Sequence, residues 1–178
     1  MRIERDSGFD ERQINMKHQL PIGTILNNQY ILGKVLGQGG FGITYIGWDR
    51  LLDMPVAIKE FYPGSMVSRD CTIQTEIHCY TNARDAYEDS KNRFLREAKA
   101  LARFREVPEI VHVQNFFEEN GTAYIVMEYV HGVTLDVWVH EHKPDVKTLL
   151  NMFRGPIDAL DAIHRQGVQH RDIKPGNM

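Results

Sequence analysis

The last residues of the chain carry the side chains with the clearest capacity for chemistry. Residues 170–177 read HRDIKPGN, and the sequence then ends at Met178. Transfer of a phosphoryl group needs a carboxylate for the attacking hydroxyl, an amide oxygen for a metal ion, and a cation near the transferring phosphate. Asp172, Asn177 and Lys174 could supply these three groups. Each residue alone is commonplace, but their order within one short segment favours phosphoryl transfer.

A glycine-rich segment, GQGGFG at residues 37–42, matches the pattern G-x-G-x-x-G. Dinucleotide-binding folds share this pattern, but in those folds a helix follows the glycines directly. Here residues 43–48 read ITYIGW, which is a strand pattern. The segment is therefore predicted to connect two strands and to lie over phosphates, since no side chains keep its backbone away. An ordinary glycine-rich hairpin is the alternative.

A lysine stands at the end of the apolar segment VAIK, residues 56–59. A strand lysine usually lies at a sheet edge or faces solvent. However, Ala57 and Ile58 are apolar, and Lys59 lies one strand beyond the glycine-rich segment. That position suits an ammonium group that reaches the phosphates of a bound nucleotide.

The rest of the pattern predicts the elements that would position these residues. Short runs rich in β-branched and aromatic residues predict strands over 30–36, 42–48, 55–61, 110–117 and 122–129, with an Asn-Gly hairpin turn between the last two. Alternating residues predict a further half-buried strand over 71–79. Helices are predicted over 85–105, 135–140 and 146–166. The last is apolar nearly all round, which is typical of a helix buried on all sides, so we expect these 178 residues to cover it by self-association or to leave its end poorly ordered.

With these motifs together, the chain resembles the eukaryotic-like Ser/Thr protein kinases of bacteria, from about Leu20 to its last residue. The segments GQGGFGITY, VAIKEFYP, FFEENGTAYIVMEYVHG and HRDIKPGN carry the resemblance. It implies an α+β, protein-kinase-like fold with a five-stranded antiparallel sheet and one principal helix in the N-terminal lobe. It also implies an N-terminal lobe and hinge over 21–131 and the start of a helical C-terminal lobe over 132–178. Residues 1–20, with charged side chains of both signs and scattered apolar ones, are predicted to be a polar, mobile extension.

The resemblance implies a nucleotide site for ATP. Within it Lys59 would contact the α- and β-phosphates, Ala57 would pack on adenine, and Met127 would be the gatekeeper at the back of the site. The residues that match the family's nucleotide-binding positions are Leu36, Gly37, Gln38, Gly39, Gly40, Phe41, Gly42, Thr44, Ala57, Lys59, Met127, Glu128 and Val130.

The resemblance also implies catalytic roles and a protein substrate phosphorylated on Ser or Thr. Asp172 would be the catalytic base, Lys174 would contact phosphate, and Asn177 would bind Mg²⁺. Glu97 would form an ion pair with Lys59. A local pair with a basic residue of the same helix, such as Arg93, is the alternative for Glu97.

Composition limits the other functional classes. The 178 residues are 42% hydrophobic and 25% charged, with a net charge of −3, which suits a folded domain. There is no basic stripe that would indicate nucleic acid as a partner, and no apolar run long enough for a membrane span. Cys71 and Cys79, without a secretory signal, predict a reduced, cytoplasmic protein.

Two functions stay open from the sequence. One is a catalytic protein kinase, and the other is a non-catalytic kinase-like module that binds nucleotide or partners; a small-molecule kinase is disfavoured by the His-Arg-Asp-x-Lys order. The given sequence stops before the family's Asp-Phe-Gly and Ala-Pro-Glu segments. We therefore expect these 178 residues alone to be inactive in phosphate transfer.

Overall fold

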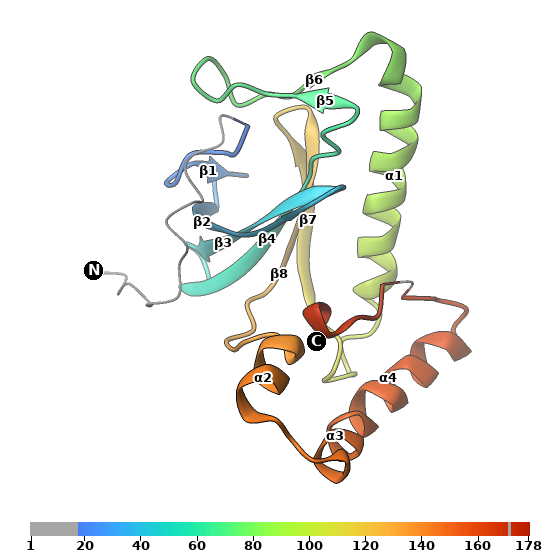
Figure 1. The fold of residues 1–178 in the computed structure, drawn as a ribbon. Helices are drawn as coiled ribbons and strands as arrows, with labels where there is room; N and C mark the ends of the chain where they lie inside the picture. The colour runs from blue at the N-terminus through green and yellow to red at the C-terminus, as the bar shows by residue number, and fades with distance from the viewer. Residues whose placement is uncertain (1–17, 171) are drawn as a thin grey trace.

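The computed structural model describes residues 18–170 and 172–178, and it shows an antiparallel sheet with one long helix beside it and short helices below (Figure 1). The strands, in their order across the sheet, are β1 (Ile25–Leu26), β2 (Tyr30–Gly39), β3 (Gly42–Asp49), β4 (Met54–Phe61), β8 (Thr122–Glu128) and β7 (Val113–Glu119). The five predicted strands are all present. The structure adds β1 as a short edge strand paired with the start of β2.

Strand β4 lies in the middle of the sheet, and its side chains alternate between two differently covered faces. Val56, Ile58 and Glu60 are buried on one face, in a core closed by the curved sheet. On the other face, the Phe61 ring packs against helix α1 (Arg84–Leu101), 5.4 Å from the Tyr87 ring between centroids. The strand therefore separates a closed core from the surface that carries α1.

Helix α1 is the predicted principal helix, and it ends before the predicted residue 105. Tyr87, Phe94 and Ala98 are its buried residues and face the sheet. Lys91 joins the helix to β7, because its Nζ lies 3.0 Å from a carboxylate oxygen of Glu118. Beyond Leu101 the chain leaves the helix, and a loop leads to β7 (Figure 1).

The prediction of a strand over 71–79 is wrong. Only β6 (His78–Cys79) is extended, and it pairs with β5 (Val67–Ser68) in a separate two-stranded sheet. Residues 71–73 form a turn instead, because the Asp70 carboxylate accepts hydrogen bonds from the backbone N–H and the hydroxyl of Thr72, at 3.0 and 2.5 Å. Both cysteines are free thiols; the cytoplasmic location stays a prediction.

One residue that the sequence assigned to the polar extension, Leu20, packs in the sheet lobe. Residues 1–17 lie outside the described part of the chain, but Leu20 is buried in the core of the sheet lobe. Its backbone N–H donates to the Tyr45 hydroxyl at 3.1 Å. The lobe therefore includes residues that the sequence assigned to the extension.

The helices that follow the sheet are α2 (Leu135–His142), α3 (Val146–Met152), α4 (Arg154–Arg165) and the one-turn η2 (Pro175–Asn177). The prediction of one helix over 146–166 is wrong, because the chain breaks at Phe153. Pro156 lacks the N–H that would donate to the Met152 carbonyl, and its ring disfavours a continuous helix there.

The surface of α3 and α4 is also less completely buried than the sequence indicated. Ala159 and Ile163 are buried, while Leu150 and Ile157 are exposed. Self-association through this surface stays a prediction. Within the described ranges, none of the helices has the length and apolar character needed to cross a bilayer.

Gly42 provides a test of the packing between β3 and β4. A Cβ at this position would lie 2.3 Å from the backbone oxygen of Glu60, whereas a Cβ at Gly39 would meet no atom within 4 Å. We expect Gly42→Ala to lower the free energy of unfolding by about 1–3 kcal/mol, because the strands must move apart. Urea denaturation measures this change. Gly39→Ala is the control, and an equal loss in both variants would contradict the packing argument.

Candidate active site

The side chains predicted to surround a nucleotide lie on one face of the sheet. Thr44 on β3 stands directly opposite Lys59 on β4, and Ala57 on β4 stands opposite Met127 on β8. Directly opposed residues of antiparallel strands share a face. Lys59 is exposed and Thr44 and Met127 are half-buried, so this face is partly open.

The glycine-rich loop closes one end of this face. Residues 37–39 belong to β2 and pair with residues 42–44 of β3, so the loop is a tight hairpin between two strands, as predicted. A Cβ at Gly37, Gly39 or Gly40 would meet no protein atom within 4 Å, and none of the three has a positive φ. The fold itself therefore does not require glycine at these positions. Close approach of the backbone to a ligand explains them better.

The structure does not pair Lys59 with Glu97. Both side chains are exposed, and among the described residues no ion pair involves either of them. The Lys59 ammonium instead lies 6.0 Å from the ring centroid of Phe94, which precedes Glu97 by about one helical turn on α1. The helix therefore brings the turn that precedes Glu97 close to Lys59, without an ion pair between Lys59 and Glu97.

The C-terminal segment brings together the three residues that the sequence singled out. Lys174 Nζ lies 3.1 Å and Asn177 Nδ2 lies 2.8 Å from the same oxygen of the Asp172 carboxylate. Asn177 Nδ2 also donates to the Asp172 backbone oxygen at 2.9 Å. Hydrogen bonds from Lys174 and then from Asn177 hold the pKa of Asp172 below its usual value. Asp172 is therefore a carboxylate at neutral pH.

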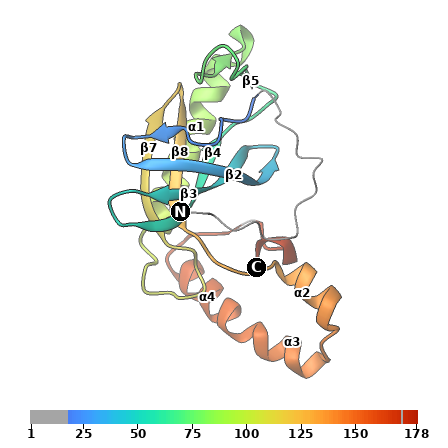
Figure 2. The ribbon, with the colours of Figure 1, turned by 90° about the vertical axis from the view of Figure 1, so that its left-hand side faces the viewer.

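Both ribbon views place this segment between the sheet and the helices α2 to α4 (Figures 1 and 2). The Met178 backbone oxygen accepts a hydrogen bond from the Leu135 N–H at 2.8 Å, which fixes the segment to the start of α2. The group of Asp172, Lys174 and Asn177, which we call the Asp172 cluster, thus lies where the sheet meets the helices.

Comparison with known proteins identifies the family. The protein kinase domain model matches residues 30–178, which is most of the chain. The chain belongs to the protein kinase family. PrkC, a serine/threonine-protein kinase of Bacillus subtilis, is 32% identical over 158 residues, and a probable serine/threonine-protein kinase of Streptomyces coelicolor is 35% identical. These alignments cover 88% and 86% of this chain but only 21% and 20% of the relatives.

Solved structures agree with this assignment. The apo form of PpkA-294 superposes with a TM-score of 0.81 at 33% identity, over 90% of this chain and 57% of that one. The kinase domain of Mycobacterium tuberculosis PknI gives 0.65 at 25% identity, over 89% of this chain and 56% of its own. The chain therefore spans about a fifth of the length of these curated relatives and somewhat over half of these two solved chains.

The segment predicted to be the hinge begins at the end of β8, and one contact there was missed from the sequence. The Glu128 N–H donates to the His112 backbone oxygen at 3.0 Å, and the His112 N–H donates to the Glu128 carboxylate at 3.1 Å. Both bonds use the backbone groups of His112, so the identity of this residue gave no signal for the contact in the sequence. Val130 is 63% exposed, and its N–H has no acceptor within the described ranges, so it is available to a ligand.

Asn177 has the chemistry that the predicted magnesium ligand needs. Because its amide nitrogen is held by Asp172, its amide oxygen points away from that carboxylate. Mg²⁺ prefers oxygen ligands and usually keeps several waters, so one amide oxygen together with phosphate oxygens suits it. Asn177 would supply one ligand.

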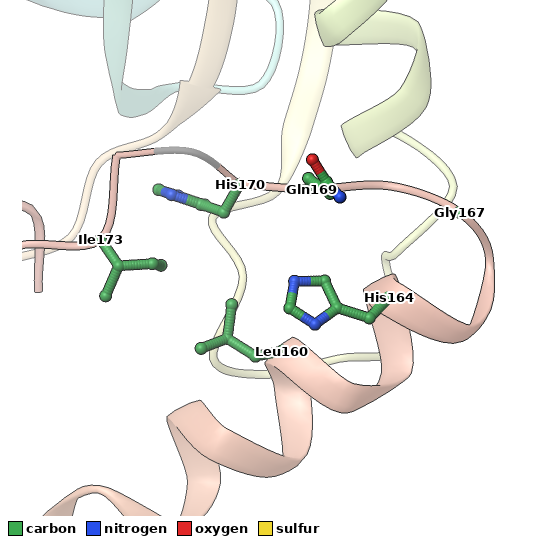
Figure 3. Close-up of a pocket in the computed structure, with 6 residues that line it drawn as sticks. All are labelled: Leu160, His164, Gly167, Gln169, His170 and Ile173. Atoms are coloured by element: carbon green, nitrogen blue, oxygen red, sulfur yellow. The ribbon is translucent and has the colours of Figure 1, made fainter.

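A hollow lies between α4 and the segment that was predicted to be catalytic. Figure 3 shows His170, Ile173 and Gln169 facing Leu160 and His164 of α4 across this hollow. The His170 Nδ1 lies 3.4 Å from the Asp172 backbone N–H, which donates to it. The hollow is therefore lined by α4 and by residues on both sides of Asp172 in the sequence.

The Asp172 cluster leads to a prediction about the pKa of Asp172. Lys174→Met removes the strongest stabilisation of the ionised carboxylate, so the pKa of Asp172 should rise toward its ordinary value of about 3.9. Carbon-13 NMR of the carboxyl group against pH measures this shift. Lys147→Met, an exposed lysine on α3, is the control. Unchanged titration of Asp172 in Lys174→Met would show that the observed contact does not form in solution.

Proposed function

We propose that this chain carries the ATP-binding and catalytic-loop residues of a serine/threonine protein kinase, which transfers the γ-phosphate of ATP to hydroxyl groups of proteins. The observation that carries the proposal is the contact of Lys174 and Asn177 with one oxygen of the Asp172 carboxylate. These are the three groups that phosphoryl transfer to a hydroxyl needs, and they occur in a chain of the protein kinase family.

Each residue has a role that its environment supports. Asp172, ionised at neutral pH, would accept the hydrogen bond of the substrate hydroxyl and then its proton. Lys174 carries a positive charge beside it and would offset the charge of the phosphate. Asn177 would hold Mg²⁺, which neutralises charge on the phosphates when bound. Catalysis in this family depends on positioning and electrostatics, and these contacts supply the positioning.

The sheet face would bind the nucleotide. Ala57 and Met127 provide an apolar surface for adenine, and Val130 offers a backbone N–H. Lys59 is a positive charge on the same face, next to the glycine-rich loop, and would contact the α- and β-phosphates. The relatives are serine/threonine kinases by name, and the Asp172–Lys174 spacing resembles that class, which supports Ser or Thr as acceptors.

A non-catalytic, nucleotide-binding module is the second candidate function. One observation favours it: Lys59 and Glu97 are not paired here, whereas transfer by protein kinases needs that ion pair in place. Because helix shifts reversibly make and break this pair in the family, the intact Asp172, Lys174 and Asn177 favour the catalytic function.

Nucleotide binding by the 178-residue chain tests the site. Lys59→Ala should weaken ATP binding about tenfold and leave adenosine binding nearly unchanged, because it removes only a charge at the phosphates. Isothermal titration calorimetry with both ligands measures the difference, with Lys147→Ala as the control. An equal loss for ATP and adenosine would contradict the phosphate contact.

Phosphate transfer tests the catalytic role separately. The 178-residue chain alone should show no turnover above background with ATP and Mg²⁺, because it contains no Asp-Phe-Gly aspartate for the metal. Joined to the remaining kinase-domain segment of a relative such as PrkC, it should phosphorylate a general protein substrate, and Asp172→Asn should reduce the rate by at least about 100-fold.

Radiolabelled ATP measures the transfer. Robust turnover by the short chain that Asp172→Asn abolishes would show that the missing segments are not needed. Failure of the joined chain, when it folds and binds ATP, would favour the non-catalytic module.

A further inference from the structure

A buried ion pair lies on the face of β4 opposite Lys59. Glu60 is fully buried, and both its oxygens accept hydrogen bonds from the Arg69 guanidinium, at 2.5 and 2.9 Å. The hydroxyl groups of Tyr45 and Tyr124 donate to the same carboxylate at 2.9 and 3.1 Å. Burial alone would lower the pKa of Arg69, but the hydrogen bonds and charge of Glu60 raise it above its ordinary value. Arg69 therefore keeps its positive charge although it is buried.

Arg69 extends this network to the first described residues. Its Nε and one terminal nitrogen donate to the His18 backbone oxygen, at 2.8 and 2.5 Å. The guanidinium also lies 5.1 Å from the centroid of the Tyr62 ring, on which the His18 ring stacks at 5.4 Å. The segment 18–20 is thus held against the sheet lobe by a buried charge.

The same segment contacts the glycine-rich loop. Gln38, between the first two glycines of the loop, has its side-chain amide 3.1 Å from Gln19 Nε2, which donates to its oxygen. The His18 ring nitrogen lies 3.0 Å from the Gln38 amide nitrogen. All three side chains are accessible to solvent at this contact. A continuous series of contacts therefore runs from β4 through Arg69 and the segment 18–20 to the loop.

We propose that Arg69 and Gln38 are positioning residues for the glycine-rich loop: Arg69 holds the segment 18–20 in place, and this segment holds the loop through Gln38. The proposal rests on the proposed function for its consequence, because the loop would then be held at the height needed to cover the phosphates of ATP. Neither residue needs to touch the nucleotide through its side chain for this effect. Arg69 acts from the far face of the sheet, and Gln38 acts from the outer side of the loop.

The contact of Gln38 with the segment 18–20 should slow opening of the loop even in the absence of nucleotide. Hydrogen–deuterium exchange of the backbone amides over 36–44 reports how often the hairpin opens. Gln38→Ala removes the contact without touching the core, and it should speed exchange of the loop about two- to fivefold, which corresponds to one hydrogen bond. Exchange over 18–20 and the melting temperature should stay nearly unchanged in this variant.

Arg69→Gln should have a wider effect. It releases the His18 backbone oxygen, so exchange should become faster both over 18–20 and in the loop. Lys91→Met is a control for the loss of a less buried ion pair, the one between α1 and β7. Loop exchange in Lys91→Met should stay as in the unsubstituted chain.

Two results would overturn the proposal. One is unchanged loop exchange in Gln38→Ala, a variant with no reason to misfold. The other is a rise in loop exchange in Lys91→Met equal to that in Arg69→Gln, since this would indicate a loss of overall stability. Neither result would contradict the proposed nucleotide site.

The consequence for the nucleotide has its own readout. Gln38→Ala should weaken ATP binding about two- to fivefold and leave adenosine binding unchanged, because only the phosphates lie under the loop. If Lys59→Ala shows no phosphate contact but the exchange results hold, the proposed function fails while the positioning of the loop by Arg69 and Gln38 stands. If ATP binds through Lys59 and loop exchange is unchanged in Gln38→Ala, the positioning proposal fails alone.

Discussion

The alternation of side chains along β4 is the constraint on which the rest of this lobe depends. The strand is central, with β3 on one side and β8 on the other, so a shift by one residue would exchange its two faces. In the observed register Lys59 reaches the open face and Glu60 enters the closed core. Lys59 and Glu60 therefore separate the proposed nucleotide face from the polar network around Glu60.

A carboxylate in the middle of a sheet is stable only with complete partners. Arg69, Tyr45 and Tyr124 supply four hydrogen bonds to Glu60, and removing one ionic partner of such a pair costs about 3–5 kcal/mol. Arg69 belongs to the insertion between β4 and α1, so the pair also attaches that insertion to the sheet. The buried Arg69 thereby helps to order the insertion between β4 and α1, which has little regular structure of its own.

The elements that were predicted correctly are those whose signal lies in residues close together in the sequence. The strands and α1 were predictable because the spacing of apolar residues along the sequence indicates each of them. The Asp172 cluster was predictable because Asp172, Lys174 and Asn177 lie within one short segment. The turn at Asp70 and the break before Pro156 were missed, although both have local causes in side-chain hydrogen bonding and a missing N–H. The separation of Lys59 from Glu97, and the contact of His18 with Arg69, depend on tertiary packing and have no local signal.

The central claim is that one face of the sheet, together with the Asp172 cluster, forms a nucleotide site. Backbone amide NMR of the 178-residue chain during titration with ATP and Mg²⁺ tests it most directly, because every region of the fold reports at once. The account predicts that the signals that shift belong to residues 36–44, 57–59, 127–130 and 172–177, with those of α3 unchanged. Shifts confined to residues outside these four segments, or no shifts at millimolar ATP, would contradict it.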